Sequence, residues 1–166
     1  MSNRDGGRHW LGIYLNDHLA GATARAELAR RAAGSHQDPR HRKRLAALAA
    51  DIAADRQALL QLMRGAGVPV RGHKILAGWA AGKAIRLNPS ANFLPRSPLS
   101  ELIELETLYL GIQGKAARWR ALLAATANEA LTDQKRLRIL LDRAGDQLAV
   151  VEELRIQAGV GLFSPG

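Results

Sequence analysis

The sequence has no cysteine, only 4% aromatic residues and no long uninterrupted apolar segment. The absence of cysteine excludes disulfide bonds, thiolate metal sites and a cysteine nucleophile. No segment approaches 18 consecutive apolar residues, and the opening MSNRDGGRHW lacks the apolar stretch of a signal peptide. Glycine-rich phosphate-binding motifs are also absent. We therefore expect a cytoplasmic protein without nucleophilic or nucleotide-dependent chemistry.

Apolar residues recur at intervals of three and four over four long segments, and this pattern predicts four amphipathic helices. The helices are expected at residues 8–34, 39–66, 98–126 and 131–160. Asp38-Pro39 and Ser97-Pro98 each place a capping side chain before a proline at the first helical position. Residues 1–7 lack such a pattern, and we expect them to be disordered.

The predicted connections are unequal in length. The first and second helices are joined by about four residues, as are the third and fourth, whereas the crossover at 67–97 is much longer. A short basic amphipathic helix is expected within it, near 73–87. Two helical hairpins joined by one long crossover form a four-helix bundle whose second and third helices start at the same end. The sequence thus predicts a single all-α domain over residues 1–166.

Polar side chains interrupt the apolar stripes of the predicted helices. We expect a buried polar layer made of His18, Asp55, Arg56, Glu106, Gln113, Glu152 and Arg155. Pairing the helices about their short loops sets His18 level with Asp55 and Arg56. It also sets Glu106 level with Glu152 and Arg155. Buried ionisable groups are either paired or functional, so a guanidinium bridging two carboxylates is the structural interpretation. On that interpretation, Arg155→Leu should strongly destabilise the protein.

This arrangement resembles the ferritin-like superfamily over nearly the whole chain. Metal-binding members place a glutamate on the first and third helices and Glu-x-x-His on the second and fourth. Here Glu106 takes the third-helix position, and Glu152-Glu153-Leu154-Arg155 has arginine in place of histidine. The second helix offers Asp51 and Asp55 without a matching histidine, and the first offers His18. Arginine has no free lone pair for a metal, so the resemblance implies a ferritin-like bundle without a working di-metal centre or other cofactor.

Basic residues outnumber acidic residues, for a net charge of +9. Residues 1–97 carry 16 Lys and Arg against 6 Asp and Glu, whereas residues 98–166 carry 8 against 9. A basic patch is expected from Arg40, Arg42, Lys43, Arg44, Lys74, Lys83 and Arg86. Such a patch can bind nucleic acid or an anionic membrane, or it can be a solvated face. A GC-rich genome would equally enrich the chain in arginine.

Three functions remain open from the sequence. We favour a non-enzymatic protein with a structural or interaction role, and a homodimer because the third helix is apolar over a wide arc. One alternative is a module that binds nucleic acid or an anionic membrane through its basic surface. The other is a divergent ferritin-like metalloprotein or oxidase that uses His18, Asp55, Glu106 and Glu152.

Overall fold

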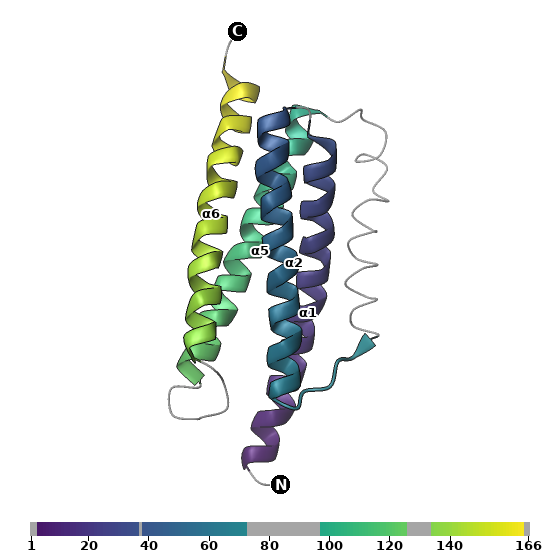
Figure 1. Ribbon diagram of the computed structural model, residues 1–166, viewed down its shortest axis with the longest axis vertical. Coiled ribbons are helices and arrows are strands. Elements are labelled where there is room, and N and C mark those ends of the chain that lie inside the picture. Colours follow the sequence, from purple (N-terminus) through teal and green to yellow (C-terminus); the bar gives the residue numbers. More distant parts are fainter. Residues whose placement is uncertain (1–2, 37, 73–96, 126–133, 165–166) are drawn as a thin grey trace.

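The computed structural model describes residues 3–36, 38–72, 97–125 and 134–164 (Figure 1). Within these ranges the chain forms long helices and no strand, which confirms the predicted all-α class. The helices are α1 (Asn3–Ser35), α2 (Pro39–Gly65), α5 (Pro98–Ala125) and α6 (Gln134–Phe163). The helix expected near 73–87 lies outside the described residues. Among the described helices, none is long and apolar enough to cross a membrane.

The four helices form two antiparallel hairpins that pack side by side (Figure 1). α1 packs on α2 and on α5, and α6 packs on α5 and on α2. α2 and α5 start at the same end of the bundle, where His36 Nε2 lies 2.8 Å from Glu101 Oε1. α2 and α5 therefore run in the same direction across a diagonal of the bundle, and each packed neighbour runs antiparallel.

The helix starts follow from the capping residues seen in the sequence. The Asp38 carboxylate accepts a hydrogen bond from the backbone N–H of Arg40 at 2.7 Å, with proline at the first position of α2. Ser97 Oγ accepts from the backbone N–H of Ser100 at 3.2 Å at the start of α5. These bonds satisfy backbone donors that have no partner within the helix.

The first and last helices extend further toward the two ends of the chain than the apolar pattern predicts. α1 begins at Asn3 rather than at residue 8, so residues 3–7, which we expected to be disordered, are helical. α6 continues to Phe163 rather than ending near residue 160. Once a helix is nucleated, each added residue gains a backbone hydrogen bond without needing an apolar partner. Figure 1 shows the first turns of α1 extending beyond the rest of the bundle.

The buried residues of α2, α5 and α6 alternate at spacings of three and four, as in other packed bundles. The three core seams are Leu45, Leu48, Ile52, Asp55 and Leu59 on α2; Leu105, Leu108, Ile112, Lys115, Trp119 and Leu122 on α5; and Leu137, Leu140, Ala144, Gln147, Val151 and Leu154 on α6. Each seam contains one polar residue. These three residues, Asp55, Lys115 and Gln147, are the polar members of the seams.

Candidate functional site

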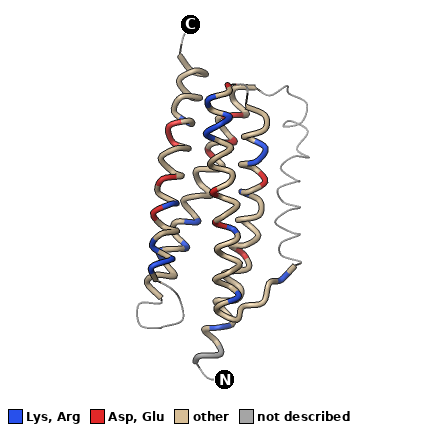
Figure 2. The backbone as a smooth tube through the Cα atoms, viewed as in Figure 1, with Lys and Arg blue, Asp and Glu red and all other residues tan. Residues whose placement is uncertain are grey.

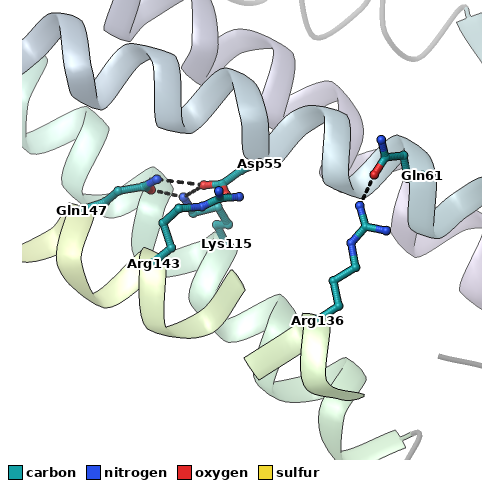
Figure 3. Close-up of polar contacts among 6 residues, drawn as sticks. All are labelled: Asp55, Gln61, Lys115, Arg136, Arg143 and Gln147. Carbon is teal, nitrogen blue, oxygen red and sulfur yellow. Dashed lines mark hydrogen bonds and ion pairs between the residues drawn. The ribbon is translucent and has the colours of Figure 1, made fainter. Parts of the chain in front are cut away.

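Asp55, Lys115, Arg143 and Gln147 meet in the interior of the bundle and form its central cluster (Figure 3). The Lys115 ammonium donates to Asp55 Oδ2 and to Gln147 Oε1. Gln147 Nε2 donates to Asp55 Oδ2 at 3.0 Å, and Arg143 Nε donates to Asp55 Oδ1 at 2.7 Å. Asp55 and Gln147 are each 2% exposed and Lys115 is 3% exposed. Both oxygens of the buried carboxylate are therefore bonded to donors from α5 and α6.

Lys115 crosses the diagonal of the bundle, because it belongs to α5 and its carboxylate partner to α2. Burial lowers the pKa of Lys115 to about 8, and the attraction of Asp55 offsets only part of that effect. The ammonium is thus charged at neutral pH. Figure 3 shows a second link between α2 and α6, in which Arg136 Nη2 donates to Gln61 Oε1 nearer the end of the bundle.

Arg25 and Arg118 add two further positive charges between α1 and α5. Arg118 is 1% exposed, and its guanidinium carbon lies 3.9 Å from the ring centroid of Trp119. Among the described residues, no hydrogen-bond acceptor reaches Nε and Nη1 of Arg118 or Nη2 of Arg25. Burial first, and then the charge of Arg25, lower the pKa of Arg118 to about 9, so Arg118 is charged at pH 7. The face of the Trp119 ring attracts the Arg118 guanidinium through a cation–π interaction.

Gly111 makes room for Arg25. A Cβ at this position would lie 2.5 Å from Cδ and 2.9 Å from Cγ of Arg25. These atoms are the middle of the side chain rather than its free end, so they cannot move aside easily. The close approach of Arg25 to α5 depends on glycine here.

His18 lies beside this cationic region. Its ring centroid is 4.4 Å from that of Tyr14. Burial first, and then the charges of Arg118 and Arg25, lower the pKa of His18 to about 4, and the Asp17 carboxylate offsets only part of that effect. The imidazole is therefore neutral at pH 7.

The structure does not form the predicted layer of His18, Asp55 and Arg56. Asp55 bonds only to α5 and α6 residues in the described chain, whereas Arg56 Nε donates to Thr23 Oγ1 on α1 at 3.0 Å. Successive residues of a helix point about 100° apart, so Asp55 and Arg56 face different neighbours. Asp55 is buried as we expected, but its cationic partners come from the other hairpin.

Arg155, Glu106 and Glu152 do meet, but at the surface, and we call them the edge cluster. Arg155 donates two 2.8 Å hydrogen bonds to Glu152 and lies 3.5 Å from Glu106. Their side chains are 32%, 47% and 37% exposed for Arg155, Glu106 and Glu152. The two carboxylates raise the pKa of Arg155, and Arg155 lowers that of Glu152. The expected burial of this trio is wrong, because the α6 seam passes through Leu154 and leaves Arg155 at its edge.

Gln113, the last member of the predicted layer, is half-buried. Its Nε2 donates to Tyr109 Oη at 3.2 Å on the same helix. Gln113 thus lies beside the α5 seam, and its neighbour Ile112 belongs to the core. Its polar group is satisfied locally and takes no part in the central cluster.

The residues of the proposed metal site do not converge. Asp55 is bonded to cations in the interior, Glu106 and Glu152 lie at the surface with Arg155, and His18 lies among arginines. Within the described ranges, no group of three or more His, Cys, Asp or Glu side chains is placed to hold a metal ion. These residues do not fit a di-metal centre.

The described part of the basic patch is partly neutralised. Arg40, Arg42 and Lys43 are exposed at the start of α2, but Arg44 makes two hydrogen bonds of 2.9 and 2.6 Å to Glu153. Lys74, Lys83 and Arg86 lie outside the described residues. Figure 2 shows the described basic residues spread along the length of the bundle, with acidic residues interspersed among them. This distribution does not form one continuous basic face on the described helices.

Four participants in the interior, Lys115, Arg118, Arg143 and Gln147, were not predicted. The predicted layer places Gln113 in the core of α5, whereas the buried seam runs one position away, through Ile112 and Lys115. The signal that would have found Lys115 is the three-and-four spacing of its own seam.

Comparison with known proteins gave no match to any family model, curated protein or solved structure.

Proposed function

We propose that this chain is a non-enzymatic four-helix bundle of ferritin-like architecture, without a di-metal centre, that has a structural or interaction role. The directions of the helices support the architecture, because α2 and α5 start at the same end and all packed neighbours are antiparallel. The proposed function rests on the charged residues that occupy the interior of the bundle.

The position of the Lys115 ammonium is the observation that carries this proposal. In ferritin-like metal proteins, carboxylates from facing helices surround metal cations in the bundle core. In this chain the buried carboxylate of Asp55 binds the ammonium of Lys115 and the guanidinium of Arg143. Protein cations thus supply the positive charge, and a metal would have to displace them while entering a region that already holds Arg25 and Arg118.

Metal content tests the proposal directly. The full chain is purified without chelator, incubated with Fe(II), Mn(II) or Zn(II), desalted and measured by inorganic mass spectrometry. We expect less than about 0.1 metal per chain and the same melting midpoint with and without EDTA, because no described ligand set fits a metal.

Two variants locate any metal that does bind. Stoichiometric metal that is lost in Asp55→Ala would place a metal at the centre and overturn the proposal. Stoichiometric metal that is lost in Glu106→Ala would place it at the edge cluster, with the same consequence. Asp51→Ala, an exposed carboxylate on α2, is the matched control for nonspecific loss of charge.

The interaction role is supported by apolar side chains that face away from the core. Leu99, Ile103 and Leu110 on α5 are spaced by four and seven residues, so they form one exposed stripe. Ile156, Val160 and Phe163 on α6 are exposed as well. A second copy of the chain that packs on the α5 stripe would cover this surface and give the homodimer that we expect from the sequence.

Light scattering coupled to size exclusion tests the homodimer. The wild-type chain should have twice the mass of one chain at micromolar concentration, and Ile103→Glu/Leu110→Glu should have the mass of one. Ala50→Glu, on an exposed position of α2 across the diagonal of the bundle from α5, should leave the dimer intact. A wild-type mass of one chain at every concentration would remove the homodimer but not the metal-free bundle.

A further inference from the structure

A pocket of about 300 Å³ lies where the N-terminal part of α1 meets the segment that follows α2. In Figure 1 that segment, residues 66–72, leaves the end of α2 and passes α1. The pocket is far from the central cluster along α2, since Asp55 lies three turns before the helix ends. Its volume is at the lower end of the range for small-molecule sites.

The lining of this pocket is cationic on one part and apolar on another. Arg8, His9 and Arg71 supply the polar groups, and no acidic residue lines the pocket within the described chain. None of the ion pairs among the described residues includes Arg8 or Arg71. Leu11 and Val68 contribute apolar surface. Two guanidinium groups that form no ion pair with a carboxylate of the described residues suit a ligand that carries two negative charges.

A buried asparagine fixes one wall. Asn16 is 1% exposed, and its Nδ2 donates to the carbonyl oxygens of Gly12 at 2.8 Å and Pro69 at 3.0 Å. Its Oδ1 accepts from the backbone N–H of Arg71 at 2.7 Å. Asn16 therefore ties the segment that carries Arg71 to α1, so that the pocket exists before a ligand binds.

The opposite wall is set by the end of α2. Gly67 has φ of 65°, and Val68 N–H donates to the carbonyl of Met63 at 2.8 Å, which ends the helix in a Schellman motif. Arg8 Nη2 lies 3.2 Å from the position that a Cβ on residue 67 would occupy. The left-handed backbone favours glycine at 67, and a Cβ there would also push the guanidinium of Arg8 slightly aside.

We propose that this pocket binds a small phosphate monoester, with the phosphate between Arg8 and Arg71 and the organic group on Leu11 and Val68. A phosphate dianion can accept hydrogen bonds from both guanidinium groups at once, and a carboxylate offers fewer oxygens and one charge fewer. The phosphate can belong to a soluble metabolite or to a lipid headgroup. This site is separate from the central cluster and does not depend on the metal or dimer experiments.

Calorimetric titration of the full chain tests the site with three probes. Phenyl phosphate carries both the charge and an apolar group, inorganic phosphate carries only the charge, and phenol carries only the apolar group. We expect saturable one-to-one binding of phenyl phosphate, weaker binding of inorganic phosphate and none of phenol. Absence of saturable phenyl phosphate binding at low ionic strength would overturn the proposal.

Three variants assign the binding to this pocket. Arg71→Gln should weaken phenyl phosphate binding at least about tenfold, the effect of losing one charged hydrogen-bond donor. Gly12→Leu should abolish it, because a Cβ at residue 12 would already contact Val68 Cγ1 at 4.0 Å, so the rest of a leucine side chain would take up space in the pocket that both residues line. Arg64→Gln removes an exposed charge from the last turn of α2 and should change the affinity less than about twofold. Equal weakening by Arg64→Gln and Arg71→Gln would show diffuse attraction and reject the pocket.

Vesicles distinguish the two sources of phosphate. Phosphatidylcholine vesicles with and without phosphatidic acid are offered to the chain in the presence of phenyl phosphate. Binding to phosphatidic acid that phenyl phosphate displaces, and that Arg71→Gln loses, assigns the site to a lipid headgroup. Phenyl phosphate binding without vesicle binding assigns it to a soluble monoester.

Discussion

The central cluster and the edge cluster use the same chemistry in different surroundings. In each, one ion is bonded to groups from a neighbouring helix or turn: Asp55 to Lys115 and Arg143, and Arg155 to Glu106 and Glu152. Asp55 and Lys115 are 2–3% exposed, whereas the members of the edge cluster keep a third to a half of their surface in water.

This difference decides what each cluster contributes to stability. Groups at the edge exchange hydration for an ion pair and gain little, because water solvates them when the pair breaks. Asp55 and Lys115 at the centre have already lost their hydration, so each depends on its partner. The distance between two charged groups in a helical bundle therefore does not by itself show how much their ion pair contributes to stability.

Removal of the central carboxylate should have the largest effect. Asp55→Ala leaves the Lys115 ammonium buried among Arg25 and Arg118 with no negative partner. We expect the free energy of unfolding to fall by about 3–5 kcal/mol, the usual loss when one partner of a buried pair is removed. Urea unfolding at pH 7 measures it. The exposed carboxylate variant Asp51→Ala should match the wild type, and equal losses in the two variants would contradict the buried pair.

The pKa of Lys115 predicts how stability depends on pH. Because its folded-state pKa of about 8 lies below the ordinary 10.5, the unfolded chain binds more protons between these values. The contribution of Lys115 to the free energy of unfolding should therefore rise from pH 8 to 10.5, by on the order of 2 kcal/mol, and stay constant below pH 8.

Urea unfolding at pH 7.5 and pH 10 measures this rise against Lys115→Met, which has no group to titrate. The wild type should gain stability relative to the variant at the higher pH. An identical response in both proteins would show that the ammonium keeps its ordinary pKa despite its burial.

The sequence predicts the four helices, their caps and their directions better than it predicts the interior. Asp38 and Ser97 act locally through bonds to nearby backbone groups, so adjacent residues suffice to identify them. The interior depends on which of two adjacent residues faces the core. Leu140 and Leu141 are both apolar, and so are Leu108 and Tyr109, so hydrophobicity alone leaves the phase of α5 and α6 undecided.

The correct phase has a signature that combines all three seams. With spacings of three and four, each seam has a single polar interruption, which is Asp55 on α2, Lys115 on α5 and Gln147 on α6. A carboxylate, an ammonium and an amide can satisfy one another if they are level. The predicted layer instead places Glu106 and Gln113 in the core of α5, and Gln113 has no partner from another helix among the described residues. Mutual satisfaction between seams is thus a better criterion for phase than the apolar count of each helix.

Replacing the three polar seam residues together tests whether the central cluster stabilises the fold more than apolar side chains of similar volume would. In Asp55→Leu/Lys115→Met/Gln147→Leu, each seam becomes continuously apolar with side chains of similar volume. Arg143 is 32% exposed and can turn to water when Asp55 is lost. We expect the free energy of unfolding to lie within about 1 kcal/mol of the wild type or above it, as for other buried pairs replaced by apolar residues.

Urea unfolding gives the stability of this triple variant, and the one-dimensional proton NMR spectrum reports whether it keeps one packing. A loss of stability as large as that of Asp55→Ala would show that the cluster stabilises the fold. Wild-type stability with a spectrum that shows several packings would assign the cluster a role in specificity instead.

The edge cluster should give the smallest effect, although the sequence pattern predicted a large one for Arg155→Leu. Arg155 leaves behind Glu106 and Glu152, and both carboxylates are exposed enough to be hydrated without it. We therefore expect the melting midpoint of Arg155→Leu to stay within experimental error of the wild type, and to stay there in high salt, since little ion-pair energy is available to screen. A midpoint lowered as far as that of Asp55→Ala would mean that the edge cluster is buried in the native assembly. The α5 stripe of Leu99, Ile103 and Leu110 lies on the same helix as Glu106, so the dimer variant Ile103→Glu/Leu110→Glu should then remove the effect of Arg155→Leu.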